Sequence, residues 1–384
     1  MYLELTGEQR MIQEMAADFA RTELEPVAAE LDRTKNREIL KANLKKMAEL
    51  GLMTMAVPEK YGGAEVGAVA YSLAMTQIAK ACAATAVTMS VTNMVAEVIA
   101  EFAPEELKSK YIPRLASGEY LAGAFGLTEP QAGSDPRNMR TFAAPDGEHF
   151  VLNGSKRFIS SAEYAGIFVI WAVTRKEAIR QGRGISAFLV EAGTPGFIVG
   201  KDEEKMGQVG SSTNELIFED CRIPRTQLLG NLDDGFRIAL MELDGGRIGI
   251  ASLALGIGLA AMDFATQYAK QREQFGQPIA NFQAIQWMIA DAYTELEAAR
   301  WLIMRAAWLK ENGKPYSLPA SMAKVYASET ANRVCYQAIQ MLGGYGYTKE
   351  YPVERYARDA RITTLYEGTS EIQRLVIARH ILSR

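Results

Sequence analysis

The sequence predicts an α+β multidomain protein in which an all-helical N-terminal domain (1–119) and a C-terminal four-helix bundle (231–384) flank a small β-barrel or sandwich (120–230). Up to about residue 118, apolar residues recur at helical spacing and period-two alternation is almost absent. From Tyr120 the chain consists of short β-branched or aromatic runs separated by turn residues, which is typical of small barrels and sandwiches. From about Gly235 long helical stretches joined by short loops return, as in helix bundles.

Capping residues and apolar stripes define the helices of the N-terminal domain. Thr6 and Gln9 have the spacing of a capping box, and the first stripe is expected to end before Pro26. A second helix is expected to end at Gly51, and Pro104 is expected to open the last one, because proline and acidic residues fit a first turn. The apolar positions are Met11, Ile12, Met15 and Phe19, then Leu40, Leu44 and Met47, then the buried stretches Val69–Ala81 and Ala86–Ala100.

The middle domain is expected to be built from short strands. Asn153-Gly154 lies between two apolar runs and is expected to form the turn of a β-hairpin. Further turn residues occur at Pro145-Asp146-Gly147, Gly182, Gly184 and Pro195-Gly196. The expected strands are Leu121–Leu127, Phe150–Leu152, Gly166–Thr174, Ile185–Glu191, Phe197–Val199 and Glu215–Phe218.

Three long helices are expected in the C-terminal domain, at Phe236–Arg272, Phe282–Asn312 and Leu318–Leu342. The first contains Gly256–Ala261, which matches the dinucleotide-binding pattern G-x-G-x-x-A. A genuine fingerprint follows a strand and opens a helix. Because no strand precedes this segment, its glycines are interpreted as a surface for close helix packing.

Composition excludes several classes of protein. The net charge of −4 and the pI of about 5.6 argue against nucleic-acid binding. No uninterrupted apolar run reaches the ~18 residues of a membrane span, and no signal pattern opens the chain, so no membrane insertion is expected. Three separated cysteines indicate free thiols in a reducing compartment. His149 and His380 receive no role, and no metal site is expected.

The stretch Leu365–Arg374, LYEGTSEIQR, places one carboxylate on a short connection before a helix. Ser370 and Gln373 fit a capping box with Ser370 as N-cap, and Ile372, Leu375 and Val376 form the apolar stripe of a packed helix. Beside an aromatic residue, the Glu367 carboxylate is expected to be partly desolvated, which would raise its pKa and strengthen it as a base. Considered alone, a solvated glutamate in a helix cap explains the same residues.

Four further segments have both a binding and a structural interpretation. Phe125–Asp135 offers the Thr128 and Ser134 hydroxyls and backbone N–H groups, or simply ends a strand. Lys156–Ser161 places Phe158 and Ser160 on one side of a strand, or shows ordinary alternation. The last two are Arg272–Gln283, whose arginine suits a pyrophosphate or a helix C-terminus, and Gln340–Tyr347, whose glycines suit a ligand or a C-cap.

The order and spacing of these segments resemble the acyl-CoA dehydrogenase family over essentially the whole chain. The family pattern LTEP-x-AG-SD occurs at Leu127–Asp135 and R-x-x-FG-x-PI at Arg272–Ile279. LGG-x-GY occurs at Leu342–Tyr347, and YEGTSEIQR at Tyr366–Arg374. The helical, β and helical thirds also match the family's three-domain fold.

The resemblance implies an FAD enzyme. The residues that match positions around the isoalloxazine ring are Phe125, Leu127, Thr128, Ser134, Phe158, Ile159 and Ser160. The family often has Trp and Thr where this chain has Phe158 and Ser160, which keeps an aromatic face and a hydroxyl. The ADP half matches Arg272, Phe275, Gln283, Gln340, Gly343 and Gly344, partly across a subunit interface, which implies a homotetramer built as a dimer of dimers. Thr369, Ser370 and Glu371 also match FAD contacts.

The same resemblance implies dehydrogenation of an acyl-CoA to the trans-2-enoyl-CoA. Glu367 would remove the α-proton while flavin N5 takes the β-hydrogen as hydride, and electrons would pass to an electron-transfer flavoprotein. The backbone N–H of Glu367 and the flavin ribityl hydroxyl would stabilise the enolate. The acyl-CoA contacts match Ser134, Asp244, Arg247, Tyr366 and Gly368. The expected location is the bacterial cytoplasm, or the mitochondrial matrix for a processed chain.

Some subfamilies do not fit. The isovaleryl-type enzymes carry their base at the position of Gly246, and the glutaryl-type enzymes carry an arginine at a position that matches Ala86. Cyclic-diene-forming relatives lack the glutamate that this chain has at Glu367. A saturated, uncharged, short to medium acyl group is therefore expected. An oxidase that uses O₂ and a non-catalytic flavin-binding homologue are the alternatives.

Overall fold

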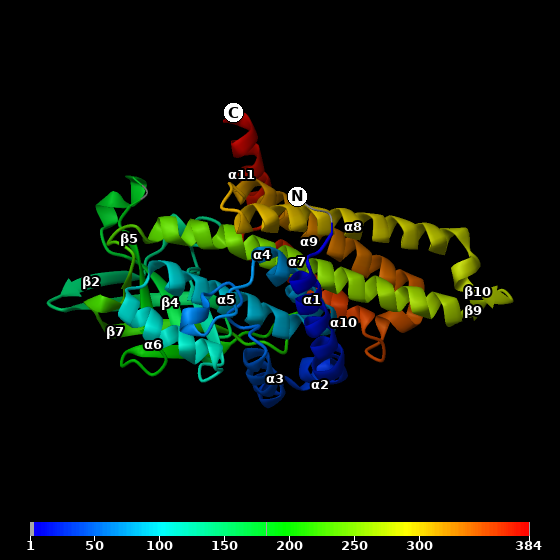
Figure 1. The fold of residues 1–384 in the computed structure, drawn as a ribbon, viewed down its shortest axis with the longest axis horizontal. Helices are drawn as coiled ribbons and strands as arrows, with labels where there is room; N and C mark the ends of the chain where they lie inside the picture. The colour runs from blue at the N-terminus through cyan, green and yellow to red at the C-terminus, as the bar shows by residue number, and fades with distance from the viewer. Residues whose placement is uncertain (1–3, 182, 384) are drawn as a thin grey trace.

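The computed structural model describes residues 4–181 and 183–383 and has the expected order of a helical domain, a β domain and a second helical domain (Figure 1). The sheet lies at one end of the long axis. The long C-terminal helices run from it towards the opposite end, where the small β9–β10 hairpin (Glu273–Gln274 and Gln277–Pro278) is found. The two ends of the molecule are therefore connected by the helix bundle.

The predicted N-terminal helices are present. Thr6 and Gln9 form the predicted capping box. The first helix ends at Phe19, before Pro26 as predicted, and a π-helical turn, Ala20–Leu24, joins it directly to the next helix. There Pro26 occupies the first turn, where its missing N–H costs no hydrogen bond. The helices are α1 (Gly7–Phe19), α2 (Glu25–Thr34), α3 (Arg37–Glu49), α4 (Ala68–Ala81), α5 (Ala83–Phe102) and α6 (Glu105–Ala116).

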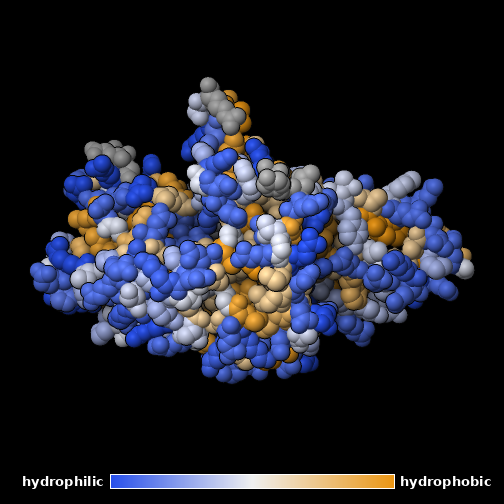
Figure 2. Space-filling view, viewed as in Figure 1, coloured by the Kyte–Doolittle hydropathy of each residue, from blue (hydrophilic) through white to orange (hydrophobic). Residues whose placement is uncertain are grey.

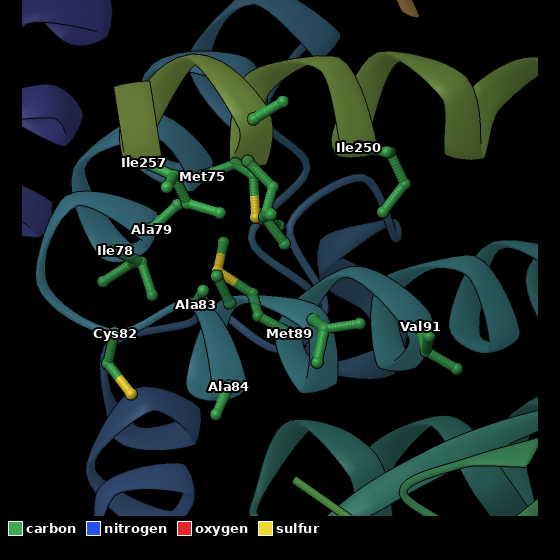
Figure 3. Close-up of a cluster of buried hydrophobic side chains, with 14 of the residues drawn as sticks. Met75, Ile78, Ala79, Cys82, Ala83, Ala84, Met89, Val91, Ile250 and Ile257 are labelled. Atoms are coloured by element: carbon green, nitrogen blue, oxygen red, sulfur yellow. The ribbon is translucent and has the colours of Figure 1, made fainter. Parts of the chain in front are cut away.

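The core between the two helical domains is formed by α4, α5 and α7 (Gly235–Gln271), as Figure 3 shows. Met75 and Met89 meet Ile250 and Ile257 of α7 there. By length and composition alone, helices α5 and α7 could cross a membrane. The search for an uninterrupted apolar run did not find them. Most of their residues are buried inside the protein.

The interpretation of Gly256–Ala261 as a helix-packing surface is confirmed, because the segment lies within α7. A Cβ on Gly256 would lie 2.5 Å from the carbonyl oxygen of Thr76 in α4. A Cβ on Gly258 would lie 2.8 Å from Leu296 of α8 (Gln283–Glu311). These glycines let three helices approach closely. The segment lies in the interior of a helix and does not follow a strand, as a dinucleotide fingerprint would.

The middle domain is a mainly antiparallel sheet with the order β6-β7-β3-β2-β4-β5-β8, and β1 pairs with β4 in parallel. All six expected strands are present. Strands β2 and β8 were not predicted, and Pro145 and Asp146, which were expected in a turn, lie at the end of β2. The bounds are β1 (Ala122–Gly126), β2 (Phe142–Asp146), β3 (His149–Ser160), β4 (Ala165–Val173), β5 (Ile185–Glu191), β6 (Phe197–Asp202), β7 (Thr213–Pro224) and β8 (Leu228–Leu229).

The predicted hairpin turn at Asn153-Gly154 is wrong, because both residues lie inside β3. The register with β7 shifts there, so the pair marks a β-bulge. Asn153 exchanges two hydrogen bonds with Asp220 of β7. Gly154 has φ +138, and a Cβ on it would lie 2.6 Å from the Cα of Thr141. The turn of the hairpin is instead at Gly147, between β2 and β3.

The C-terminal domain contains the three predicted long helices, α7, α8 and α9 (Ser317–Leu342), followed by α10 (Val353–Arg361) and α11 (Ser370–Leu382). The predicted apolar stripe of α11 is only partly covered in the single chain. Ile372 and Val376 are half-buried, whereas Leu375 is 44% exposed. Beyond the stripe, Leu382 is 85% exposed. The helix projects from the body in Figure 1, and Figure 2 shows apolar colour on the projection.

Candidate active site

The predicted base, Glu367, lies in a short turn between α10 and α11 that has an unusual backbone. Glu367 has φ +53 and Gly368 has φ +86, so two consecutive residues adopt the left-handed conformation. Gln373 Nε2 donates to the carbonyl oxygens of Glu367 at 3.0 Å and of Gly368 at 2.9 Å. Lys324 Nζ donates to the same Gly368 oxygen at 2.7 Å. The turn is therefore held by side chains of two helices, α9 and α11.

The predicted N-cap is wrong by one residue. Helix α11 begins at Ser370, and Thr369 is its N-cap, with Thr369 Oγ1 accepting from the Ile372 N–H at 3.3 Å. After the left-handed turn, the residue with the extended backbone of an N-cap is Thr369 and not Ser370. Gln373 does reach back as predicted, but it donates to the two carbonyl groups of the turn.

The environment of Glu367 agrees with the expected desolvated base. Its Oε2 atom is buried and has no hydrogen-bond partner. Burial raises the pKa of Glu367 from 4.5 to about 7, against the opposing charges of Arg247 and Lys324. A carboxyl group with a pKa near neutrality is suited to accept a proton from a weak carbon acid.

Helix α7 supplies the side of the site that faces Glu367. A Cβ on Gly246 would lie 2.9 Å from Glu367 Oε2 and 2.9 Å from the Met94 sulfur. The next residue, Arg247, is buried and forms an ion pair with Asp244 one turn earlier. Its Nη1 also donates to Ser321 of α9 at 3.3 Å, while its Nε has no partner. Arg247 Nε and Glu367 Oε2 are thus among the buried polar atoms of this region that have no hydrogen-bond partner.

Two of the predicted flavin segments are joined by a buried ion pair. Lys156 Nζ lies 2.7 Å from Glu129 Oε1 and also donates to the Leu127 carbonyl at 3.3 Å. The Arg157 N–H donates to the Thr128 carbonyl at 2.9 Å. These contacts hold the loop after β1 against β3. Burial lowers the pKa of Lys156 to about 8, although the negative charge of Glu129 opposes this shift. For Glu129, burial acts to raise the pKa, but the Lys156 cation outweighs it and the net pKa is lowered.

The segment Phe158–Ser160 departs from a regular strand. Phe158 has φ +59 and its side chain is 60% exposed, while Ile159 is buried. The register with β7 shifts between Lys156 and Ile159. The simple alternation that placed Phe158 and Ser160 on one side is therefore interrupted by a bulge. The bulge presents the Phe158 ring as an exposed aromatic surface.

The predicted ADP-binding residues form a second group at the other end of the bundle. Arg272 caps α7 and its guanidinium lies 5.6 Å from the ring centroid of Tyr345. A surface pocket of about 520 Å³ is lined by Arg272, Gln340, Gly343 and Gly344. Together with Tyr345, these residues provide a cation, small backbone positions and aromatic faces around one hollow.

Other predicted residues do not join these groups within the chain. Phe275 is 92% exposed and Gln283 is exposed, and neither lines the 520 Å³ pocket. Ser134 is also exposed, on the loop after β1. The Arg272 loop and the β-domain segments lie at opposite ends of the molecule (Figure 1). Ser370 is buried near Glu367 with its hydroxyl unpaired, and Glu371 is exposed.

Sequence reasoning missed four polar residues that position the predicted ones: Glu129, Lys156, Gln208 and Lys324. Gln208 Nε2 donates to the Tyr366 hydroxyl at 3.1 Å, which connects the middle domain to the turn that carries Glu367. Lys324 and Lys156 are completely buried. A lone lysine among the small apolar residues Ala320, Ala323 and Ala327 of α9 was a readable signal.

Comparison with known families matches all three parts of the chain. Residues 6–119 match the acyl-CoA dehydrogenase N-terminal domain, residues 124–221 the middle domain, and residues 233–382 the C-terminal domain. The chain belongs to the acyl-CoA dehydrogenase family. This membership and the three-domain fold agree with the resemblance seen in the sequence.

Two curated relatives cover nearly the whole chain. It is 48% identical to an acryloyl-CoA reductase (NADH) of Anaerotignum propionicum, over 100% of this chain and 97% of the relative. It is 46% identical to a short-chain specific acyl-CoA dehydrogenase of Clostridium acetobutylicum, over 99% of this chain and 100% of the relative. Both relatives act on CoA thioesters according to their names.

Solved structures share the fold closely. The butyryl-CoA dehydrogenase of Megasphaera elsdenii has a TM-score of 0.95 and 42% identity, with complete coverage of both chains. A chain in a structure of the electron transferring flavoprotein of Acidaminococcus fermentans has a TM-score of 0.96 and 46% identity, also with complete coverage. A glutaryl-CoA dehydrogenase of Mycobacterium smegmatis in complex with FADH2 has a TM-score of 0.92 and 30% identity, over 99% and 96% of the two chains.

Proposed function

We propose that this protein is an FAD-dependent dehydrogenase that converts a short-chain acyl-CoA to the trans-2-enoyl-CoA, with Glu367 as the catalytic base. The observation that carries the proposal is the buried, unpaired Oε2 of Glu367, whose pKa is raised to about 7. Names of close relatives, an acyl-CoA dehydrogenase and a butyryl-CoA dehydrogenase, support the reaction class. The division into domains at 1–119, 120–230 and 231–384 is part of the proposal, and the three matched ranges support it.

The reaction requires a base that is both strong and ionised near neutral pH. The α-hydrogen of a thioester is only weakly acidic, so an ordinary solvated carboxylate would be a poor acceptor. Burial strengthens Glu367 as a base, while the cations Arg247 and Lys324 favour its ionised form. The α-proton is transferred to the carboxylate of Glu367, and the backbone N–H of the same residue donates to the enolate oxygen.

The packing beyond Glu367 supports a short acyl group. One turn along α7 from Gly246, a Cβ on Gly249 would lie 2.6 Å from the Tyr71 hydroxyl and 2.9 Å from Ser90 Oγ. Side chains of α4 and α5 therefore cover this side of α7 close to the base. The proposed contacts of the remaining acyl-CoA are Ser134, Asp244, Arg247, Tyr366 and Gly368.

The residues present fit an FAD cofactor. Phe158 offers an exposed aromatic surface beside the loop that carries Thr128, and the hydroxyl of Ser370 is unpaired at the N-terminus of α11. The FADH2 complex of a relative supports the identity of the cofactor. FAD supplies the hydride acceptor when it is bound. The protein residues that would hold it are Phe125, Leu127, Thr128, Ser134, Phe158, Ile159, Ser160, Arg272, Phe275, Gln283, Gln340, Gly343, Gly344, Thr369, Ser370 and Glu371.

The positions of these residues support a homo-oligomer. The segments for the flavin ring lie in and beside the β domain, whereas Arg272 and Phe275 lie at the far end of the bundle. One FAD could reach both groups only if a second chain supplies one of them. This separation requires at least two copies, and the family resemblance leads us to propose four. The exposed apolar residues of α11 support further contacts between copies.

An electron-transfer flavoprotein is the proposed electron acceptor, and the structure of such a protein from Acidaminococcus fermentans contains a closely similar chain. The acryloyl-CoA reductase relative supports a second candidate, the same chemistry run towards reduction of a 2-enoyl-CoA. The proposed location is the bacterial cytoplasm, with a mitochondrial matrix as the alternative. Three buried free cysteines fit a reducing compartment in either case.

Anaerobic reduction of the bound flavin tests the proposal. The wild-type protein is expected to lose its yellow colour with butyryl-, isobutyryl-, hexanoyl- or cyclohexanecarboxyl-CoA. Glu367→Gln keeps the size of the side chain but cannot accept the proton, so its rate should fall by ~10²–10⁴-fold. It should still bind FAD and be reduced by dithionite. Glu350→Gln, at an exposed position, is the matched control. Normal bleaching of the Glu367→Gln protein would refute the role of the base.

A further inference from the structure

Lys324 is an unusual residue for the interior of a helical domain. Its side chain is completely buried in α9, and its single hydrogen bond goes to the carbonyl oxygen of Gly368 at 2.7 Å. Among the described residues, no carboxylate lies within ion-pair distance of its Nζ atom. A buried ammonium group without a paired carboxylate is costly, and an apolar side chain of similar length would be the simpler solution.

The bond from Lys324 reaches the one turn whose shape matters for the reaction. Glu367 adopts a left-handed backbone conformation, which a residue with a side chain retains only when its surroundings enforce it. Gln373 donates to the carbonyl groups of both Glu367 and Gly368, and Lys324 adds a second donor to that of Gly368. Because Lys324 belongs to α9 and Gln373 to α11, the turn is held from two helices.

We propose that Lys324 is a positioning residue for Glu367: its ammonium group holds the Gly368 carbonyl and thereby keeps the Glu367–Gly368 turn in the conformation that presents the Glu367 carboxylate. This inference rests on the proposed function for its catalytic consequence. Its structural part, the coupling between Lys324 and Glu367, does not depend on the identity of the substrate.

The same placement has an electrostatic consequence that can be measured. Lys324 favours the ionised form of Glu367, and so does Arg247 of α7. Removal of the Lys324 charge should therefore raise the pKa of Glu367 further above its ordinary range. Burial lowers the pKa of Lys324 to about 7, so this effect is greatest below neutral pH. The other charged or titratable groups that interact with the pair are Glu329 of α9, Glu371 of α11, Glu242 of α7, Tyr71 of α4 and Tyr366 of the turn itself.

Lys324→Met tests the proposal, because it keeps the length of the side chain and removes the charge and the donor. In the FAD-bound protein, the maximal rate of flavin reduction by butyryl-CoA should fall by about 10–100-fold, since small displacements of a reacting group have effects of that size. The acid limb of the rate–pH profile should shift to higher pH. The apparent affinity for butyryl-CoA should change less than the maximal rate. Lys324→Arg, which keeps a cation and donors, should recover part of both effects.

An infrared titration provides a readout without substrate. The carbonyl stretch of the protonated Glu367 carboxyl group is identified by its loss in Glu367→Gln, and its midpoint should move to higher pH in Lys324→Met. Lys205→Met is the control, because Lys205 is a half-buried lysine that likewise donates to a backbone carbonyl, that of Ser211 at 2.5 Å. It should leave the Glu367 titration unchanged.

The outcomes separate this inference from the proposed function. If the wild-type protein fails to react with any acyl-CoA but the Glu367 titration still shifts in Lys324→Met, the dehydrogenase proposal fails and the coupling stands. If Lys324→Met reacts with a normal rate and a normal pH profile, the positioning role is overturned. A lower melting temperature with an unchanged Glu367 titration would also overturn it, because Lys324 would then act only in packing. If Lys324→Met does not fold, Lys324→Gln, which keeps a donor without the charge, replaces it in both measurements.

Discussion

Gly246 and Glu367 are in direct contact across the active site: a Cβ placed on Gly246 would lie 2.9 Å from Oε2 of Glu367. The same Cβ would lie 2.9 Å from the sulfur of Met94 in α5. Distances below 3 Å are shorter than ordinary carbon contacts allow, so the carboxylate can occupy its observed position only because residue 246 has no side chain.

Gly246→Ala should therefore displace the base. The methyl group should push the Glu367 carboxylate or Met94 aside, and the rate of flavin reduction by butyryl-CoA should fall by about 10–100-fold. FAD binding should be retained, because the contact involves only α7, α5 and the turn. Anaerobic stopped-flow absorbance of the flavin measures the rate.

Gly245→Ala is the matched control for this substitution. A Cβ there would lie 3.0 Å from Lys310 Nζ, the end of a flexible side chain that can move away. Its rate should stay within about threefold of wild type, a change of under 1 kcal/mol. Equal losses in the two variants would show that helix distortion, and not contact with Glu367, limits the reaction.

The buried pair Lys156–Glu129 should control the stability of the middle domain. Lys156→Met leaves the Glu129 carboxylate buried without its cation, which typically costs about 3–5 kcal/mol. Denaturant unfolding of the FAD-bound protein measures the loss, and FAD should also dissociate more readily because the pair joins two flavin segments. The double variant Glu129→Gln/Lys156→Met should recover stability, since no charge then remains buried. A single Lys156→Met variant as stable as wild type would contradict this account.

Helical periodicity was sufficient to predict most of the architecture, but local backbone conformation was not predictable from it. The long helices α7, α8 and α9 have strong apolar periods, and each was found within two residues of its expected ends. Asn153-Gly154 is typical of a hairpin turn, yet here the pair forms a bulge, because the sheet needs Gly154 beside Thr141. That requirement comes from tertiary contacts with Thr141 and with strand β7, which leave no signal in the residues around Asn153.

In the candidate site, too, some features could be predicted from the sequence and others could not. Motif order indicated Glu367, Arg247 and the flavin segments, and the desolvated carboxylate followed from its apolar neighbours. The residues that hold Glu367 in place were not predicted, because Lys324 reaches the turn from another helix and its role depends on tertiary contact. The N-cap was predicted at Ser370 but lies at Thr369. The left-handed conformation of Glu367 could not be predicted, because the residue is not a glycine.

Arg272→Ala should weaken retention of FAD. The guanidinium group lines the 520 Å³ pocket and is suited to bidentate contact with a pyrophosphate, which alanine cannot replace. Loss of one such charge-assisted contact corresponds to about 1.5–3 kcal/mol, or roughly 10–100-fold in the dissociation constant. The flavin absorbance that remains with the protein after dilution and filtration measures it.

Arg300→Ala is the control for Arg272→Ala, because Arg300 is an exposed arginine on α8 that pairs with Glu297. It should keep its FAD. Full occupancy of Arg272→Ala after the same dilution would remove Arg272 from the proposed cofactor contacts.

Glu367→Gln should make the FAD-bound protein more stable at neutral and alkaline pH, because a buried base opposes folding. The pKa of Glu367 is about 7 in the folded protein and about 4.5 when the chain is unfolded. The native state therefore keeps a proton between these values that the unfolded state releases, so stability falls as the pH rises through this window and is constant above it. The loss is on the order of 1–3 kcal/mol above neutral pH. Glutamine does not titrate and avoids this loss.

Lys324 changes the stability difference in the same direction. Without the Glu367 charge, the charged form of Lys324 is less favoured, so the variant gains more stability than the wild type as Lys324 loses its proton. Melting temperatures of both proteins measured from about pH 5 to about pH 8 should therefore diverge in favour of Glu367→Gln as the pH rises. Glu242 acts in the same direction, because its pKa is raised less when the Glu367 charge is absent. Titrating groups that do not interact with Glu367 cancel in the difference. A difference that stays constant across this range would mean that the carboxylate is solvated in the folded protein, and the elevated basicity assigned to Glu367 would be wrong.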